Sequence, residues 1–238
     1  MSADWANLGE NFRAFTARPE KSSTAGIVVF QEIFGVNGHI RGIVSNLGRM
    51  GYVTIAPEIF HRTAPKFEVG YDEGGVKLGR KHKEECTAEN LLADARASMD
   101  WLKTQGCTRI GCVGFCFGGH VAWLAGTLEG MACCACFYGG GIGKYRPGGG
   151  PPSVELAPQL KSRMLMLFGE TDTSIPQDEI QQIAAALQRS RVRHDVHVFA
   201  GAGHGFACDE RHAYTPSAAN MAWLDVFKMF AEDLKAGP

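Results

Sequence analysis

Residues 109–125 read Arg-Ile-Gly-Cys-Val-Gly-Phe-Cys-Phe-Gly-Gly-His-Val-Ala-Trp-Leu-Ala, and this stretch decides the fold. The apolar run Arg109–Val113 is typical of a buried strand, and Gly118–Gly126 is typical of a helix. Between them, Cys116 takes the central position of a Gly-x-Cys-x-Gly pattern, where a nucleophile elbow usually carries serine. A sharp turn from strand to helix needs small neighbours, and the sequence supplies them at Gly114, Gly118 and Gly119. We therefore predict an exposed thiol at a strand–turn–helix junction.

This junction also predicts the chemistry of the thiol. A turn of this kind aims the N-terminus of the following helix at Cys116, where the helix dipole and free N–H groups favour a thiolate. The alternative is that Cys116 is one more buried thiol in a chain that has eight cysteines. The others are expected to be inert core residues, because no export signal is visible and the trio Cys133, Cys134 and Cys136 lies in an apolar run typical of a buried strand. We expect no metal and no cofactor.

Short apolar strands and amphipathic helices alternate along the rest of the chain, which is typical of a mostly parallel sheet with helices on both faces. We predict a single domain over residues 1–238, with 1–10 as a loose N-terminal segment and Asn11–Ala17 as an edge strand. The other predicted strands are Gly26–Glu32, Tyr52–Ala56, Met131–Tyr138, Met164–Phe168 and Asp195–Phe199. The other predicted helices are His39–Met50, Ala88–Thr104, Gln177–Gln188 and Ser217–Leu234.

Two stretches fall outside this alternation. Residues 61–86 are polar and rich in glycine and lysine, and the charged run at 80–85 is expected to be a solvated face. Residues 139–152 combine glycines and prolines, which disfavours both helix and strand. We predict a loop there, close to the functional site, and a lid role for it is an attractive hypothesis.

The bulk composition excludes several classes of partner. The chain has 238 residues, a formal net charge of −1 and 45% hydrophobic residues. A near-neutral charge balance gives no reason to expect nucleic acid or an anionic membrane as a partner. The longest apolar runs are too short to span a bilayer, and the first residues lack the basic start of a signal peptide. We expect a cytoplasmic protein that acts on a small molecule.

A thiol nucleophile needs a base, and the base needs a carboxylate that orients it. Asp172 follows the predicted strand Met164–Phe168, and His204 follows the strand that ends at Phe199. The chain order nucleophile, acid, histidine is that of the α/β-hydrolases. Each member follows a different strand, at the carboxyl end of the sheet where sites in open α/β folds gather. The sequence therefore predicts an α/β-hydrolase fold with these side chains together.

Five segments carry a more specific resemblance. They are Gln-Glu-Ile-Phe-Gly-Val-Asn-Gly-His-Ile-Arg at 31–41, Gly-Tyr-Val-Thr-Ile-Ala-Pro-Glu-Ile-Phe-His-Arg at 51–62, the cysteine elbow, Asp172, and Gly-His-Gly-Phe at 203–206. Together they resemble the dienelactone hydrolase (carboxymethylenebutenolidase) family, from about residue 10 to the C-terminus. The resemblance implies that Cys116, Asp172 and His204 form a catalytic triad. It also implies that the backbone N–H groups of Ile33 and Phe117 form the oxyanion hole.

The resemblance implies a further role for Glu32. In relatives this carboxylate interacts with the resting thiol and moves away when substrate binds. A carboxylate beside Cys116 would disfavour a permanent thiolate and so protect it from oxidation. We therefore expect a resting Cys116 that alkylates slowly, and faster in Glu32→Gln.

The substrate-binding residues are where the chain departs from the family. Dienelactone hydrolases hold a substrate carboxylate with arginines, one of them four residues after the catalytic histidine, and here that position is Cys208. Arg211 is the nearest candidate to replace it, and Arg62 and Arg80 are the candidates for the other arginine. Further candidates for the pocket wall are Phe34, Tyr138 and Phe206.

These observations favour a cysteine-dependent hydrolase of a lactone or a small carboxylic ester, acting through a thioester. A dienelactone is one possible substrate, and a lactone or ester without the carboxylate is another. Two alternatives stay open. One is a non-enzymatic thiol protein, a redox sensor or binding module on the same fold. The other is a hydrolase that uses the same triad on phosphotriesters or thioesters.

Overall fold

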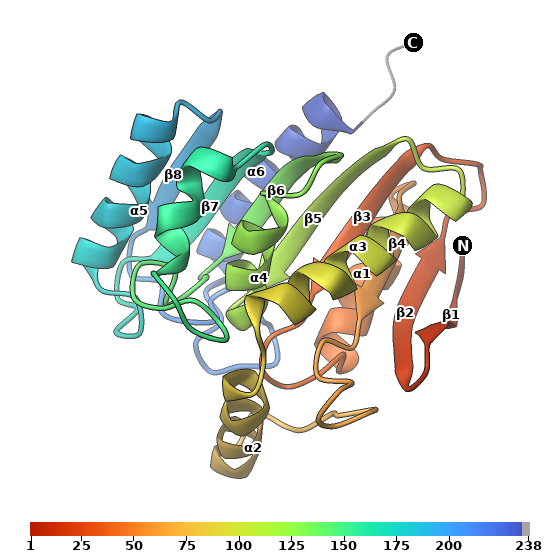
Figure 1. The fold of residues 1–238 in the computed structure, drawn as a ribbon, viewed down its shortest axis with the longest axis horizontal. Helices are drawn as coiled ribbons and strands as arrows, with labels where there is room; N and C mark the ends of the chain where they lie inside the picture. The colour runs from red at the N-terminus through yellow and green to blue at the C-terminus, as the bar shows by residue number, and fades with distance from the viewer. Residues whose placement is uncertain (235–238) are drawn as a thin grey trace.

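The strands of the protein form one eight-stranded sheet (Figure 1). The computed structural model describes residues 1–234. The strands are β1 (Ser2–Gly9), β2 (Phe12–Arg18), β3 (Ala25–Phe30), β4 (Val53–Pro57), β5 (Arg109–Phe115), β6 (Met131–Phe137), β7 (Arg163–Gly169) and β8 (His194–Phe199). Their order in the sheet is β1-β2-β4-β3-β5-β6-β7-β8. All neighbours from β4 to β8 are parallel, and only β2 runs against its two neighbours. The predicted mostly parallel sheet is confirmed.

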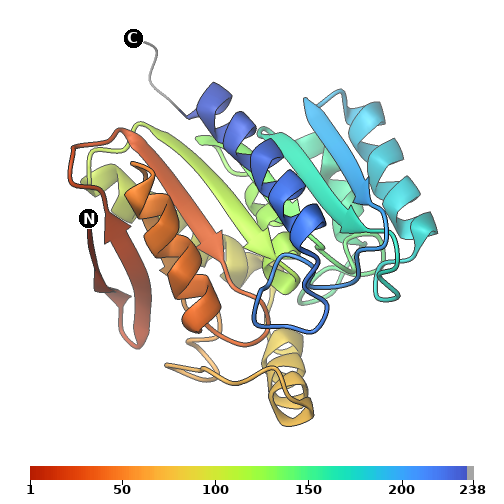
Figure 2. The same ribbon diagram turned by 180° about the vertical axis from the view of Figure 1, so that it is seen from behind.

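Helices cover both faces of the sheet, as predicted. They are α1 (Gly38–Arg49), α2 (Glu73–Glu84), α3 (Ala88–Thr104), α4 (Phe117–Ala125), α5 (Gln177–Ser190) and α6 (Pro216–Asp233), with a 3-10 helix η1 (Ser153–Gln159). Helices α1 and α6 lie on the face seen in Figure 2, and α3 and α4 on the face seen in Figure 1. Helix α2 lies off the sheet, beyond the carboxyl ends of the strands (Figure 1).

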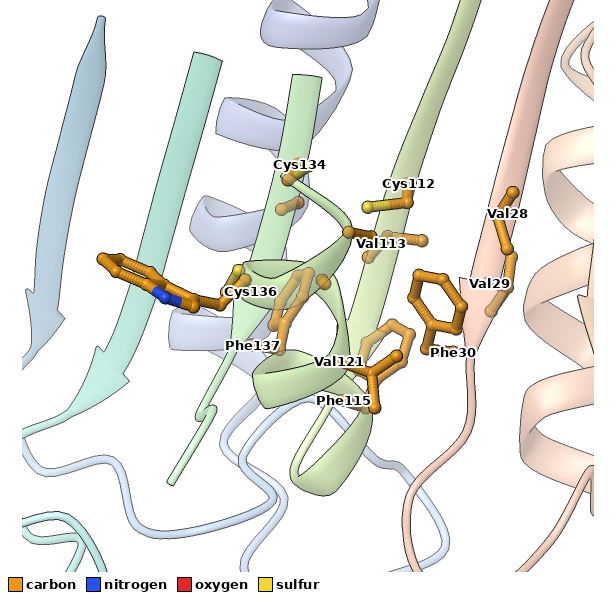
Figure 3. Packing of buried hydrophobic residues seen from close by; sticks show 14 of the residues in the cluster. Val28, Val29, Phe30, Cys112, Val113, Phe115, Val121, Cys134, Cys136 and Phe137 are labelled. Carbon is orange, nitrogen blue, oxygen red and sulfur yellow. The ribbon is translucent and has the colours of Figure 1, made fainter. Parts of the chain in front are cut away.

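The core lies between these layers and is built from the central strands (Figure 3). Cys112, Cys134 and Cys136 pack there among Val113, Phe115 and other apolar side chains. All three thiols are free and fully buried. Burial raises the pKa of the Cys112 and Cys136 thiols well above the usual value. These cysteines are therefore inert core residues, as the sequence predicted.

No helix within residues 1–234 is long and apolar enough to cross a membrane.

The structure corrects three expectations near the edges of the fold. Residues 2–9 are not a loose segment but strand β1, which pairs antiparallel with β2. Strand β2 is therefore second from the edge rather than the edge itself. The polar stretch at 61–86 contains helix α2, capped by Asp72, whose side chain accepts a hydrogen bond from the Gly75 N–H. The last four residues of the predicted domain lie outside the described part of the chain.

The turn between β5 and α4 depends on very close backbone contacts. A Cβ atom on Gly118 would collide with the carbonyl oxygens of Phe30 and Gln31, at the end of β3. A Cβ atom on Gly119 would lie 2.7 Å from the carbonyl oxygen of Phe137, at the end of β6. The first turn of α4 is thus packed tightly against the ends of β3 and β6, which flank β5 in the sheet, and only glycine fits at these contacts.

We predict that Gly118→Ala lowers the free energy of unfolding by about 3 kcal/mol, because the added methyl group must displace backbone rather than a flexible side chain. Urea unfolding followed by circular dichroism measures the change. The matched control is Gly42→Ala on α1, where an added Cβ meets nothing within 4 Å. That control is expected to raise the free energy of unfolding by about 0.5–1 kcal/mol. Equal stability of the two variants would contradict this tight packing of α4 against the strands.

Candidate active site

Cys116 stands at the turn between β5 and α4 with a strained backbone. Its φ of 54° and ψ of −115° are conformations that residues other than glycine rarely adopt. The Cys116 N–H donates a hydrogen bond of 3.0 Å to the carbonyl oxygen of Phe137, which holds the turn against β6. The side chain is partly exposed, whereas the seven other cysteines are buried. Strain at one exposed residue in a packed turn is typical of a functional site.

His204 and Asp172 come together as the sequence predicted. The Nδ1 atom of His204 lies 2.7 Å from Oδ2 of Asp172, whose side chain is fully buried. The other oxygen of Asp172 accepts a hydrogen bond of 2.8 Å from the Ser174 N–H. An Asp172 carboxylate can only accept, so Nδ1 of His204 carries the proton and Nε2 is left for another partner.

The Cys116 thiol lines the same pocket as His204. Burial by itself lowers the pKa of His204, but the negative charge of Cys116 and hydrogen bonds with Asp172 and Cys116 outweigh it, and the pKa of His204 rises to about 10. His204 is therefore held by Asp172 and influenced by the Cys116 side chain.

Glu32 is placed differently from the expectation. Its carboxylate is buried, and Oε1 accepts a hydrogen bond of 3.0 Å from Nη1 of Arg211. Within residues 1–234 the second oxygen has no hydrogen-bond partner. The expected contact between Glu32 and the resting thiol is thus replaced by an ion pair with Arg211. Because the charge of Glu32 is compensated, it opposes a thiolate at Cys116 less than an unpaired carboxylate would.

Ile33 follows β3, and Phe117 begins α4, directly after Cys116. Both residues line the same pocket as Cys116. The Phe117 N–H belongs to the first turn of α4, whose N–H groups have no partner within the helix. Helix α2 packs directly against Ile33, because a Cβ atom on Gly79 of α2 would collide with the Ile33 carbonyl oxygen. The placement fits two donors facing the carbonyl oxygen of a substrate.

The thiol opens into a pocket of about 380 Å³. The residues that line it are Ile33, Phe34, Val76, Arg80, Lys83, Cys116, Phe117, Gly140, Gly141, Lys144, Tyr145, Ser174, His204 and Arg211. Four of them are cations and none is acidic. The pocket therefore presents a positive surface around the thiol.

Three of the predicted pocket residues, Phe34, Arg80 and Arg211, line the pocket. Arg62 does not. Its guanidinium makes two hydrogen bonds, of 2.8 and 2.7 Å, to the buried carboxylate of Asp94 on α3. This prediction is corrected because a buried carboxylate needs a paired cation, and Arg62 is that cation.

Tyr138 and Phe206 also lie outside the pocket wall. Both are fully buried. The ring of Tyr138 packs edge-on against His204, with ring centroids 5.2 Å apart, and against Phe206 at 5.3 Å. Tyr138 therefore packs against the histidine, and Phe206 packs behind Tyr138, instead of lining the pocket.

Lys83, Lys144 and Tyr145 are pocket residues that the sequence reading missed. Val76, Arg80 and Lys83 are spaced i, i+4 and i+7 on α2, so one face of this helix turns toward the thiol. The charged run at 80–85 is therefore not entirely a solvated face. Had α2 been recognised as a helix, this spacing would have identified the face.

The Gly-rich loop forms one wall of the pocket, as predicted, and the buried His120 of α4 ties it down. His120 Nδ1 lies 3.1 Å from the Gly140 carbonyl oxygen, and Nε2 lies 2.7 Å from the Ser153 hydroxyl. A carbonyl can only accept, so Nδ1 donates and the neutral Nε2 accepts the hydroxyl proton. Burial lowers the pKa of His120 to about 4. Both ends of the loop are thus fixed by one neutral imidazole.

One group of side chains has the composition of a metal site. Ligand atoms of His39, Cys208 and Asp209 lie within 4.8 Å of one another. However, the Cys208 thiol donates to the Tyr71 hydroxyl at 3.3 Å, and burial raises the pKa of Cys208 to about 11. A metal ligand must be a thiolate, so this environment opposes metal binding. The expected absence of a metal stays a prediction.

Comparison with known proteins agrees with this fold. Residues 12–234 match the sequence model of the dienelactone hydrolase family. A Synechocystis protein assigned as a carboxymethylenebutenolidase is 39% identical over 212 residues, covering 88% of this chain and 86% of its own. The carboxymethylenebutenolidase of Pseudomonas putida is 29% identical, covering 90% of this chain and 88% of its own.

A solved structure is similar as well. A Klebsiella pneumoniae protein assigned as a dienelactone hydrolase superposes with a TM-score of 0.87 and 30% identity, over 97% of this chain and 98% of that one. The protein is thus an α/β-hydrolase. More narrowly, the chain belongs to the dienelactone hydrolase family. It is an ester hydrolase of the dienelactone hydrolase type, which disfavours the non-enzymatic alternative.

We predict that Glu32→Gln speeds alkylation of Cys116 by iodoacetamide at pH 7, by up to about tenfold. Without the carboxylate, the cation of Arg211 is uncompensated and favours the thiolate; one pKa unit corresponds to a factor of ten. The rate is measured by mass spectrometry of the Cys116 peptide. The matched control is Glu58→Gln, since Glu58 is another buried carboxylate with one arginine partner, Arg13 at 2.8 Å. An equal rate in wild type and Glu32→Gln would contradict this electrostatic coupling.

The neutral His120 predicts acid sensitivity. The pKa of His120 is about 4 in the folded protein and 6.5 in the unfolded chain. Between these pH values the unfolded chain binds a proton at His120 and the folded protein does not. The resulting loss of stability develops as the pH falls from 6.5 to 4. Between pH 7 and pH 5 we expect the free energy of unfolding of the wild type to fall by about 2 kcal/mol more than that of His120→Gln. Urea titrations at both pH values test this, with the exposed His212→Gln as control; parallel behaviour of wild type and His120→Gln would refute it.

Proposed function

We propose that the protein is a cysteine-dependent hydrolase of lactones or small carboxylic esters, with Cys116, His204 and Asp172 as its catalytic triad. The observation that carries the proposal is the 2.7 Å contact between His204 Nδ1 and the buried Asp172, with the Cys116 thiol and His204 lining the same pocket. All three groups follow different parallel strands of one sheet edge. The substrate is a small molecule that fits a pocket of about 380 Å³.

The first step is acylation. The Cys116 thiolate attacks the ester carbonyl carbon, and the oxyanion that develops accepts hydrogen bonds from the Ile33 and Phe117 N–H groups. When the bond between the carbonyl carbon and the alkoxy oxygen breaks, the His204 imidazolium gives its Nε2 proton to the leaving oxygen. The products of this step are an alcohol, or the opened end of a lactone, and a thioester on Cys116.

The second step is hydrolysis of the thioester. Neutral His204 now accepts a proton from a water molecule, whose oxygen attacks the thioester carbonyl through the same oxyanion site. Collapse of the intermediate releases the carboxylic acid and restores the thiolate–imidazolium pair. Asp172 holds the tautomer of His204 throughout, because its buried carboxylate accepts the Nδ1 proton.

The charge of the pocket favours an anionic substrate. Arg80 and Arg211 face the thiol, and no acidic residue lines the wall. Arg211 comes from a position three residues after Cys208, yet its guanidinium reaches Glu32 and the rings of Phe34 and Tyr71. Although Arg211 stands three residues after the position where the family has its arginine, it lines the pocket together with Arg80. A substrate carboxylate would share Arg211 with Glu32, and a dienelactone is a reasonable substrate.

We predict that wild type hydrolyses p-nitrophenyl acetate and cis-dienelactone, and that Cys116→Ala loses at least about 1,000-fold in kcat/KM on both. Spectrophotometric assays measure turnover, and mass spectrometry detects the acyl group on Cys116. The matched control is Cys107→Ala, which removes a buried thiol outside the pocket wall. A phosphotriester and a thioester in the same panel test the remaining alternative.

Retention of turnover in Cys116→Ala would place the nucleophile elsewhere. If the wild type hydrolyses p-nitrophenyl acetate and shows no preference for the dienelactone, the proposed triad stands but the proposed anionic substrate does not.

A further inference from the structure

The pocket holds a second cation–aromatic pair that the proposed triad and arginines do not use. The ammonium group of Lys83 on α2 lies 5.2 Å from the centroid of the Tyr145 ring, and both side chains line the pocket. Such a distance is within the range of cation–π attraction. The first pair is that of Arg211, which lies 5.7 Å from the ring centroid of Phe34.

The two pairs differ in how their charges are compensated. Arg211 is bound to Glu32, and Lys144 lies 3.2 Å from the carboxylate of Glu179. Lys83 has no carboxylate within 4 Å in the part of the chain that the structure describes. A partly buried ammonium held over a ring without a counter-charge is a site that an incoming anion completes.

The two pairs involve segments that follow the two strands flanking β5. Strand β5, which leads into Cys116, lies between β3 and β6. Phe34 and Glu32 follow β3, and both contact Arg211. Tyr145 belongs to the loop after β6, and its ring contacts Lys83. Helix α2 lies beyond the strand ends (Figure 1). Arg80 also lines a second hollow with Tyr71, and Lys83 lines another with Pro147.

The segment that carries Tyr145 is held in place without a ligand. The Tyr145 carbonyl oxygen accepts a hydrogen bond of 3.2 Å from the Ser153 N–H, and its own N–H donates to Gly141 at 3.0 Å. The Ser153 hydroxyl in turn contacts His120, whose ring lies 5.2 Å from that of Tyr145. Because the backbone of Tyr145 is held by these bonds and its ring packs near His120, little conformational entropy is lost when a ligand binds.

We propose that Lys83 and Tyr145 form a second anion-binding subsite, and that the enzyme selects esters or lactones with an acidic group on each side of the scissile bond. One carboxylate binds beside Arg211 and the other beside Lys83. The inference rests on the proposed function, because it concerns substrates of the same thiol.

Four esters test the subsite. They are phenyl butyrate, which is neutral; monophenyl succinate, with an acid on the acyl part; 4-butyryloxybenzoate, with an acid on the alcohol part; and mono(4-carboxyphenyl) succinate, with both. The measured quantity is the ratio of kcat/KM for the diacid to that for the neutral ester. We expect Lys83→Met to lower this ratio at least about tenfold, mainly through KM, and Lys83→Arg to retain it.

The matched control is Lys81→Met, which removes the same charge from α2 at a residue outside the pocket wall and is expected to leave the ratio unchanged. Tyr145→Phe keeps the ring and retains the ratio, whereas Tyr145→Leu lowers it. In wild type the ratio falls as salt is raised, because the attraction is electrostatic. If Lys81→Met lowers the ratio as much as Lys83→Met does, the subsite is wrong, and the preference for the diacid comes from the overall positive charge of α2.

The two proposals fail in different ways. If wild type hydrolyses the neutral ester through Cys116 but Lys83→Met leaves the ratio unchanged, only the second subsite is wrong. If none of the esters is hydrolysed, or if Cys116→Ala hydrolyses them as wild type does, the proposed function itself is wrong.

Discussion

The close approach of α4 to the ends of β3 and β6 is the constraint on which the rest of the site depends. Gly118 touches the last carbonyl groups of β3, and Gly119 touches that of Phe137 on β6. A methyl group at either position would push the helix away from the sheet. Because the helix cannot move away, the chain must turn within one residue. Cys116 takes the strained conformation that results, and its side chain points out of the sheet edge.

The buried carboxylates around this turn are compensated by partners of opposite charge. Glu32 and Asp172 are both buried near Cys116, but each has a partner of its own, Arg211 and His204. A buried carboxylate without a cation would oppose a thiolate strongly. The charge of Cys116 and the hydrogen bond with Asp172 together raise the pKa of His204 to about 10, against the effect of burial.

The wall opposite the arginine is rigid for a related reason. A loop as rich in glycine as residues 139–152 has much conformational freedom to lose. His120 recovers order by binding both ends of the loop from within the core, and it can do so only as a neutral imidazole with a defined tautomer. The loop at residues 139–152 is therefore a fixed wall of the pocket, which gives no support to the lid role suggested by its composition.

The sequence by itself determined the alternation of strands and helices, the turn at Cys116, and the order of Asp172 and His204 along the chain. These features are local, because periodicity, glycine spacing and strand exits are visible within short windows. The partners of the charged residues were decided only by the tertiary structure. Arg62 belongs to Asp94, Arg211 to Glu32, and Lys83 to the ring of Tyr145. An ion pair joins residues far apart in the chain, and its choice depends on which carboxylates the fold buries; no local pattern carries that information.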